Sequence, residues 1–287
     1  MPSTQDKGMR DQIPAGDWHV DRPGGLHLSE WAAEGAGTAI LLLVVVSVVT
    51  LVFGPGSPVA GALPARSPRL LLAGLLIAGS ASLVAVSPLG RLSGGHINPA
   101  VTLGFWLTGH VHYHDLVGYV GAQLLGALAG VAVGAVVWGS RASAVGYGMT
   151  LPGSGVSDLT AGAIELAMTA VLLLAIFSMT SRPRLMRYTP LVTWILVAVL
   201  VWRLAPLTGT SLNPARSLAP ALFARNFNSL WIYLVAPPLG AALAALMVKL
   251  RLLRLPLTAK LFHDPNYRSV TRTMMPSRTP ASAGTRS

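Results

Sequence analysis

Long apolar stretches separated by short polar, glycine-rich or proline-rich segments dominate the chain. Most of these stretches approach the roughly 20 residues that an α-helix needs to cross a bilayer. We therefore expect six membrane-spanning helices, at 36–53, 70–86, 116–138, 160–180, 189–204 and 230–249. Two further apolar runs, 99–107 and 214–223, are only about three turns long, which is too short to cross.

Each short run begins at the second residue of the same triplet, Asn-Pro-Ala. Asn is a strong N-cap, because its side chain accepts a hydrogen bond from a free backbone N–H group of the first turn. Proline fits the first helical position, where its missing N–H costs nothing. The sequence therefore predicts two capped half-length helices. The triplets are Asn98, Pro99 and Ala100, and Asn213, Pro214 and Ala215.

The two halves of the chain repeat one another. The segment that starts with Glu34 and continues to Thr38 matches the segment from Glu165 to Thr169, and each half then continues with a second span, a half-helix and a third span. Three crossings per half is an odd number, so the second half enters from the opposite face. This arrangement is an inverted repeat with its site at mid-bilayer, where non-helical backbone is tolerated if it is buried or lines a wet cavity. The predicted fold is an all-α membrane protein of six transmembrane helices and two re-entrant half-helices.

Domain boundaries follow from this repeat. We expect a polar N-terminal tail at 1–27, a channel domain at 28–254 and a basic, disordered tail at 255–287. Within the channel domain, the first repeat covers 28–138 and the second covers 159–254.

Composition favours the same class of protein. Only 11% of the residues are charged, against about 25% in an average soluble protein. The net charge of +11 comes mostly from tails and short loops, without aromatic residues interleaved in a basic face, so we expect no nucleic-acid partner. Lys and Arg are more abundant on the side that would hold both termini. By the positive-inside rule, we expect both termini of this multi-pass protein to be cytoplasmic. The Gly/Ala/Val/Arg-rich chain looks bacterial, and we therefore expect the membrane to be the cell membrane.

These residues resemble the aquaporin (major intrinsic protein) family. The likeness rests on the two Asn-Pro-Ala triplets, on the paired Glu-x-x-x-Thr segments and on Arg216 and Ser217 after the second triplet. It implies a right-handed, inverted-repeat bundle, a passive channel without cofactor, and a homotetramer with one pore in each protomer.

Three groups of residues are candidates for the pore. Asn98 and Asn213 would donate N–H groups to a passing oxygen and so interrupt a chain of proton transfer, helped by the positive ends of both half-helices. By resemblance, Arg216 belongs to an outer constriction, or selectivity filter, and counting from the two Asn residues adds Ala78, Val201 (or its neighbour Trp202) and Thr210. The remaining pore-loop lining is Gly94, Gly95, His96, Ile97, Gly209, Ser211 and Leu212.

This filter departs from the patterns of the family. Strict water channels typically place Phe and His opposite the Arg, and glycerol channels place Trp, Gly and Phe. Here Ala78, Val201 and Thr210 replace every aromatic residue. The expected opening is wider, so we predict that it passes water and small uncharged solutes, with polyols, urea-like molecules and neutral metalloid acids as candidates. A strict water channel is the alternative.

Two acidic residues lie within predicted spans. Intramembrane acids are candidates for function, so Glu34 and Glu165 raise the alternative of a proton-coupled transporter. The family suggests instead that each carboxylate accepts backbone N–H groups and anchors a re-entrant loop, and we favour this role because extended loops need such partners.

A polar break follows the first half-helix. It holds His110, His112, His114 and Asp115, which are compatible with a metal site, with pH sensing or with an ordinary polar loop. We favour the loop, and assign neither a metal nor a cofactor. The chain has no cysteine and no nucleophile–base pair at motif spacing, so it is not expected to be an enzyme.

Overall fold

A computed structural model describes residues 26–250 and residue 252. The predicted N-terminal tail, apart from residues 26 and 27, and the whole predicted C-terminal tail lie outside this part of the chain. The described residues form helices and loops, with no strand among them.

Six of the helices in the described part are long and apolar enough to cross a membrane. They are α1 (Leu28–Phe53), α3 (Arg66–Val86), α6 (Tyr113–Trp138), α8 (Asp158–Thr180), α10 (Thr189–Thr208) and α12 (Leu230–Lys249). The two half-length helices are α5 (Pro99–Leu107) and α11 (Pro214–Ala224). The remaining short helices are α2 (Pro58–Ala62), α4 (Pro88–Ser93), α7 (Ser140–Ser143), η1 (Gly146–Gly148) and α9 (Pro183–Met186).

Several helices are longer than the apolar stretches that predict them. Helix α1 begins at Leu28 rather than at residue 36, because polar residues such as Glu30 are favourable in a first turn, near the positive end of the helix dipole. Helix α10 continues through Pro206 to Thr208 instead of ending at residue 204, and Gly209, with φ 78°, is its C-cap. A mid-helix proline removes one hydrogen bond, and so close to the helix end it does not break the span.

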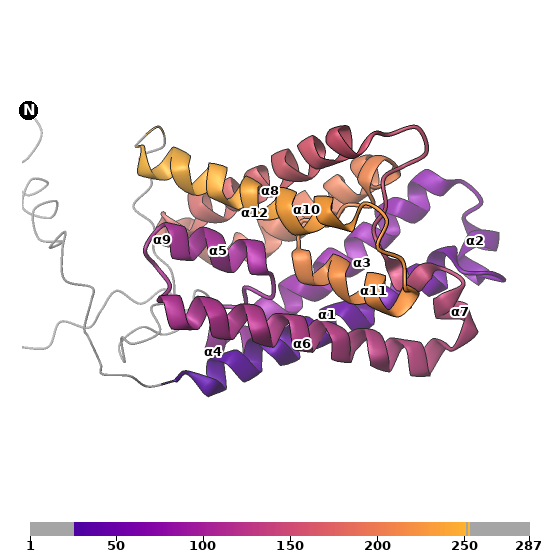
Figure 1. Ribbon diagram of the computed structural model, residues 1–287, viewed down its shortest axis with the longest axis horizontal. Coiled ribbons are helices and arrows are strands. Elements are labelled where there is room, and N and C mark those ends of the chain that lie inside the picture. The colour runs from indigo at the N-terminus through magenta and orange to yellow at the C-terminus, as the bar shows by residue number, and fades with distance from the viewer. Residues whose placement is uncertain (1–25, 251, 253–287) are drawn as a thin grey trace, which may run out of the picture.

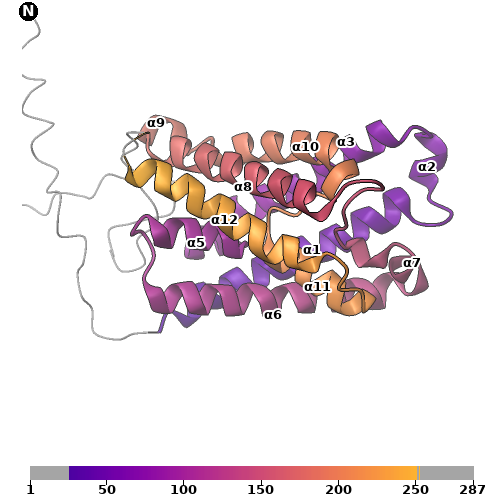
Figure 2. The ribbon, with the colours of Figure 1, turned by 45° about the horizontal axis from the view of Figure 1, so that its top comes forward.

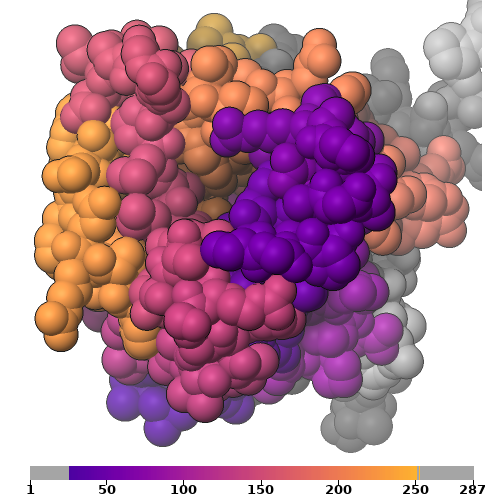
Figure 3. Space-filling view, turned by 90° about the vertical axis from the view of Figure 1, so that its right-hand side faces the viewer, coloured from indigo at the N-terminus to yellow at the C-terminus, as the bar shows by residue number. Residues whose placement is uncertain are grey.

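The packing of the helices repeats between the two halves. Helix α1 packs against α6, and α8 packs against α12 in the same way. The half-helices pack across the halves, with α5 against α12 and α11 against α6. Figures 1 and 2 show α5 and α11 end to end within the bundle, so that each reaches the interior from a different end. On the end face that carries α2 and α7, segments from both halves surround a hollow (Figure 3).

Glycines allow the closest of these contacts. A side-chain methyl at Gly126 of α6 would collide with the carbonyl oxygen of Gly35 in α1, and one at Gly130 would collide with that of Ala39. The second half has an equivalent, because a methyl at Gly240 of α12 would collide with the carbonyl of Leu166 in α8. Small residues let helices approach at backbone distance, as is typical of membrane helix pairs.

Gly126→Ala is expected to destabilise the fold by about 2 kcal/mol, because backbone atoms of α1 must move to admit the methyl group. Gly121→Ala is the matched control: the position lies on the same helix and faces open space, so the extra methyl should cost nothing. Thermal unfolding midpoints in detergent compare the two variants. Equal midpoints would contradict the close α1–α6 contact.

Candidate functional site

Each half-helix is capped by its own asparagine. The Asn98 Oδ1 accepts a hydrogen bond from the backbone N–H of Ala100 at 2.8 Å. The Asn213 Oδ1 accepts from the N–H of Ala215 at 3.0 Å. The carbonyl end of each amide is therefore held by its own helix, which leaves the NH₂ end to reach elsewhere.

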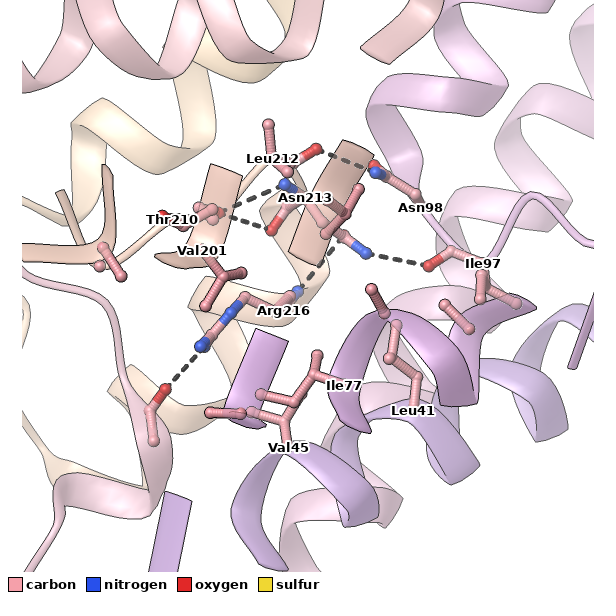
Figure 4. Close-up of a pocket in the computed structure, with 18 of the residues that line it drawn as sticks. Leu41, Val45, Ile77, Ile97, Asn98, Val201, Thr210, Leu212, Asn213 and Arg216 are labelled. Atoms are coloured by element: carbon pink, nitrogen blue, oxygen red, sulfur yellow. Dashed lines mark hydrogen bonds between the residues drawn. The ribbon is translucent and has the colours of Figure 1, made fainter. Parts of the chain in front are cut away.

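The NH₂ ends tie the two loops together. Asn98 Nδ2 donates to the carbonyl oxygen of Leu212 at 2.9 Å, and Asn213 Nδ2 donates to the carbonyl oxygen of Ile97 at 2.9 Å. The carbonyls belong to residues with positive φ, 42° at Ile97 and 59° at Leu212. Such a backbone is strained for a bulky residue, by about 1–3 kcal/mol. The reciprocal pair of bonds joins the tips of the half-helices at the centre of the site (Figure 4).

Two buried carboxylates hold the loops in this shape. Glu34 accepts the backbone N–H groups of His96, at 2.9 Å, and of Ile97, at 2.6 Å. Glu165 accepts those of Ser211, at 2.8 Å, and of Leu212, at 2.9 Å. Each carboxylate thus satisfies backbone donors that an extended loop would otherwise leave unpaired.

Two tyrosines complete the symmetry, and sequence reasoning did not identify their role. Tyr119 donates its hydroxyl to the carbonyl of Ser93 at 2.7 Å, and Tyr233 donates to the carbonyl of Thr208 at 2.7 Å. Each tyrosine follows the asparagine of its own half by about twenty residues. This shared spacing is the sequence feature from which a common role of the two tyrosines could have been predicted.

A cavity of about 440 Å³ runs along the loops and the half-helix tips. Asn98 and Asn213 lie on its wall, as do all four predicted filter residues, which come from three different segments. The predicted filter residues are Ala78 of α3, Val201 of α10, and Thr210 and Arg216 of the second loop and half-helix.

The surroundings of the predicted filter residues differ from one another. Arg216 Nη1 donates to the carbonyl oxygen of Gly148 at 2.6 Å, so the 139–157 connection helps to orient the guanidinium. Thr210 is buried, and its hydroxyl is a polar group without a hydrogen-bond partner within the described residues. Val201 lies on the wall, whereas Trp202 bonds Ser67 through its indole N–H at 2.8 Å and is outside the wall. Of these two neighbours, Val201 is therefore the one that lines the cavity.

All but one of the predicted pore-loop residues lie on the wall of the cavity. His96, Ile97, Ser211 and most of the other predicted loop residues line the cavity. Gly94 does not lie on the wall, because it caps α4 with φ 98° and so turns the chain before the loop begins.

Sequence reasoning missed the apolar side of the cavity. Leu41 and Val45 of α1 and Ile77 of α3 line it (Figure 4). On a membrane helix, apolar residues that face a pore look the same in sequence as those that face lipid. The wall therefore has polar loop groups on one side and aliphatic side chains elsewhere.

Comparison with known proteins agrees with this geometry. The family described as Major intrinsic protein matches residues 27–248. The chain belongs to the major intrinsic protein family. Its fold is that of an aquaporin, and, as expected for this family, it is a passive membrane channel and not an enzyme.

Relatives of this major intrinsic protein come from distant organisms. The chain is 38% identical over 194 residues to the lens fiber major intrinsic protein of Gallus gallus, which covers 66% of this chain and 72% of that protein. It is 34% identical over 225 residues to a glycerol uptake facilitator protein-like chain of Lactiplantibacillus plantarum, and the match covers 76% of this chain and 95% of that protein. An aquaglyceroporin structure from Plasmodium falciparum matches with a TM-score of 0.66 and 22% identity, over 80% of this chain and 98% of that one, which supports the fold.

Proposed function

We propose that this channel conducts water together with small uncharged solutes, and that Ala78, Val201, Thr210 and Arg216 form its selectivity filter. The observation that carries the proposal is one cavity whose wall includes these four residues and both Asn-Pro-Ala asparagines. Three of the filter side chains are small or aliphatic, so they leave width for a solute larger than water.

Polar groups of the filter give a passing solute its contacts. A guanidinium has five N–H donors, and the bond to Gly148 uses one of them, while the buried Thr210 hydroxyl has no protein partner among the described residues. A hydroxyl, amide or neutral acid group can bind both. The aliphatic side chains opposite, such as Ile77, suit the carbon skeleton of a polyol.

The same site disfavours ions. Both half-helices direct the positive ends of their dipoles toward the asparagines, and Arg216 adds a full positive charge nearby. Each asparagine NH₂ group has a second hydrogen besides the one used between the loops. Two such donors orient a water molecule with its hydrogens outward, which interrupts proton transfer.

The setting of the channel is also part of the proposal. We place the channel in the cell membrane with both termini in the cytoplasm, and the distribution of Lys and Arg supports this orientation. The family supports a homotetramer with one pore per protomer. A relative named a glycerol uptake facilitator supports passage of a polyol, and another named a probable aquaporin, from Arabidopsis thaliana, supports passage of water.

Stopped-flow light scattering on proteoliposomes tests the function. We expect shrinkage under an osmotic gradient to be at least about tenfold faster than in protein-free vesicles, a barrier difference of ~1.4 kcal/mol. Isosmotic gradients of glycerol, urea and boric acid should also produce swelling. Water flux without any solute flux would favour the strict water channel and contradict the wide filter.

The proton-coupled alternative makes a different prediction. Glu34 and Glu165 are not among the described residues that line the cavity, and both are fully buried against the loops. A passive channel should therefore equilibrate solute without accumulating it, whatever the pH gradient. Uphill accumulation driven by a pH gradient in the same vesicles would overturn the proposal.

A further inference from the structure

Outside the pore, two histidines and an aspartate from distant parts of the sequence meet at the first turns of α1 and α6. His27 Nδ1 lies 2.7 Å from Asp115 Oδ1, and His114 Nε2 lies 3.4 Å from Asp115 Oδ2. One nitrogen from each histidine and one carboxylate oxygen all lie within 4.8 Å of one another. The three side chains therefore converge on one small volume.

We infer that His27, His114 and Asp115 bind a divalent transition-metal ion, for which Zn²⁺ is the best fit, and that the ion links the start of α1 to the start of α6. This differs from the expectation of no metal drawn from the sequence. Two imidazole nitrogens and a carboxylate oxygen are typical ligands of zinc. An ordinary hydrogen bond explains the His27–Asp115 contact. The second imidazole, His114, faces the other oxygen of the same carboxylate, and so brings a second nitrogen donor to the volume where a zinc ion would bind.

The distances suit a shared ion. Ligand atoms about 2.0–2.1 Å from a tetrahedral zinc lie about 3.3 Å from one another. His114 Nε2 lies 3.4 Å from Asp115 Oδ2 and His27 Nδ1 lies 2.7 Å from Asp115 Oδ1, so the carboxylate must turn to present one oxygen to both nitrogens. The three ligand atoms all lie within 4.8 Å of one another, so each separation has to change by at most about 1.5 Å to reach the tetrahedral value. The side chain of Asp115 is fully buried, whereas that of His114 is 46% exposed. The site is thus anchored inside the bundle and open to solvent on one side, where a water molecule can be the fourth ligand.

The surroundings hold the carboxylate in place. Trp31 donates its indole N–H to Asp115 Oδ1 at 3.0 Å. The Trp31 ring itself packs over Gly118 of α6, where a side-chain methyl group would collide with it. Groups that orient a ligand in this way commonly raise metal affinity by about 10–100-fold. The aspartate is therefore positioned before any ion arrives.

The other two histidines of the polar break provide a comparison within the same segment. His112 stacks on His114, with ring centroids 5.5 Å apart, and is not a member of the converging group. His110 lies 3.1 Å from Thr108 through its Nδ1. Neither should be a ligand.

Metal titration of the full chain in detergent tests the site, with the protein purified without a histidine tag and first treated with a chelator. We expect calorimetry to show one Zn²⁺ per chain, and Co²⁺ to give the visible absorption of a tetrahedral site. His27→Ala and His114→Ala should each weaken Zn²⁺ binding at least about tenfold. His112→Ala, the matched control, should leave it within about twofold.

Three results would overturn the inference: no saturable one-to-one binding, unchanged affinity in both ligand variants, or an equal loss in His112→Ala. Asp115→Asn gives a second test, provided that its thermal midpoint without metal stays close to that of the unchanged chain. Zn²⁺ should raise the thermal midpoint of the unchanged chain and not that of His114→Ala. Because none of these residues lines the cavity, the osmotic water flux of the variants reports on the pore separately.

Discussion

Glu34→Gln is expected to be the most damaging single substitution, lowering the free energy of unfolding by roughly 2–6 kcal/mol, because the two donors of one carboxylate oxygen lose their acceptor at about 1–3 kcal/mol each. The carboxylate is fully buried and accepts hydrogen bonds from four donors. These donors are the Ser93 hydroxyl, the N–H groups of His96 and Ile97, and the amide of Gln123. A glutamine has the same shape, but its NH₂ group would face donors and leave buried N–H groups unpaired.

Removal of the Glu34 carboxylate should affect the pore through Ile97. Its strained φ of 42° is held on one side by the carboxylate and on the other by Asn213 Nδ2, which binds its carbonyl oxygen. Without the carboxylate the loop relaxes and the central pair of asparagine bonds is disturbed. Osmotic water flux of the reconstituted variant should fall at least about tenfold, or ~1.4 kcal/mol in barrier.

Glu30→Gln is the matched control, since Glu30 lies one turn earlier on the same helix, is only partly buried, and accepts a hydrogen bond from the neighbouring Ser29 hydroxyl rather than from the loop. We expect its unfolding midpoint and its water flux to stay close to those of the unchanged chain. The proton-coupled alternative predicts another pattern for Glu34→Gln: an unchanged midpoint and unchanged water flux, with loss of uptake driven by a pH gradient. That result would show that Glu34 is a relay and not an anchor.

The inverted repeat and the capped half-helices could be predicted from sequence, because both depend on local physics. A span is a run of apolar residues, and an Asn-Pro pair starts a helix wherever it stands. The sequence predicts that Glu34 and Glu165 accept hydrogen bonds from backbone N–H groups of the loops, but it does not identify which residues donate them. The bonds between Asn98 and Leu212, and between Asn213 and Ile97, join residues more than a hundred positions apart. No local pattern encodes them.

The walls of the cavity were harder to predict for a related reason. Along a membrane helix, apolar residues face lipid, other helices and the pore alike, so Leu41 and Ile77 have no distinguishing signal. Val201 and Trp202 could be separated only once the rotation of α10 was known. His27 is a similar case, since its partner Asp115 is 88 positions away. Only the packing of α1 on α6 brings them together.

Ala78→Phe is expected to narrow the filter enough to separate water from larger solutes. Ala78 lies on the cavity wall, and Phe is the side chain that strict water channels typically place opposite the arginine. A ring there fills the space beside Val201 and Thr210 that a polyol or urea needs, while water molecules in single file still pass. Glycerol and urea fluxes should fall at least about tenfold, a barrier increase of ~1.4 kcal/mol, with water flux falling less than about threefold, under ~0.7 kcal/mol.

Leu76→Phe serves as the control, because this leucine lies on the exposed outer side of the same helix and its ring would meet lipid. Both variants are compared with the unchanged chain in the same vesicles, at equal protein content, under osmotic and then isosmotic gradients. Unchanged solute flux in Ala78→Phe would remove Ala78 from the filter. Equal losses of water and solute would mean that the ring blocks the pore without sorting what passes, and the filter would then have to be sought among other wall residues, such as Ile77 and Leu41.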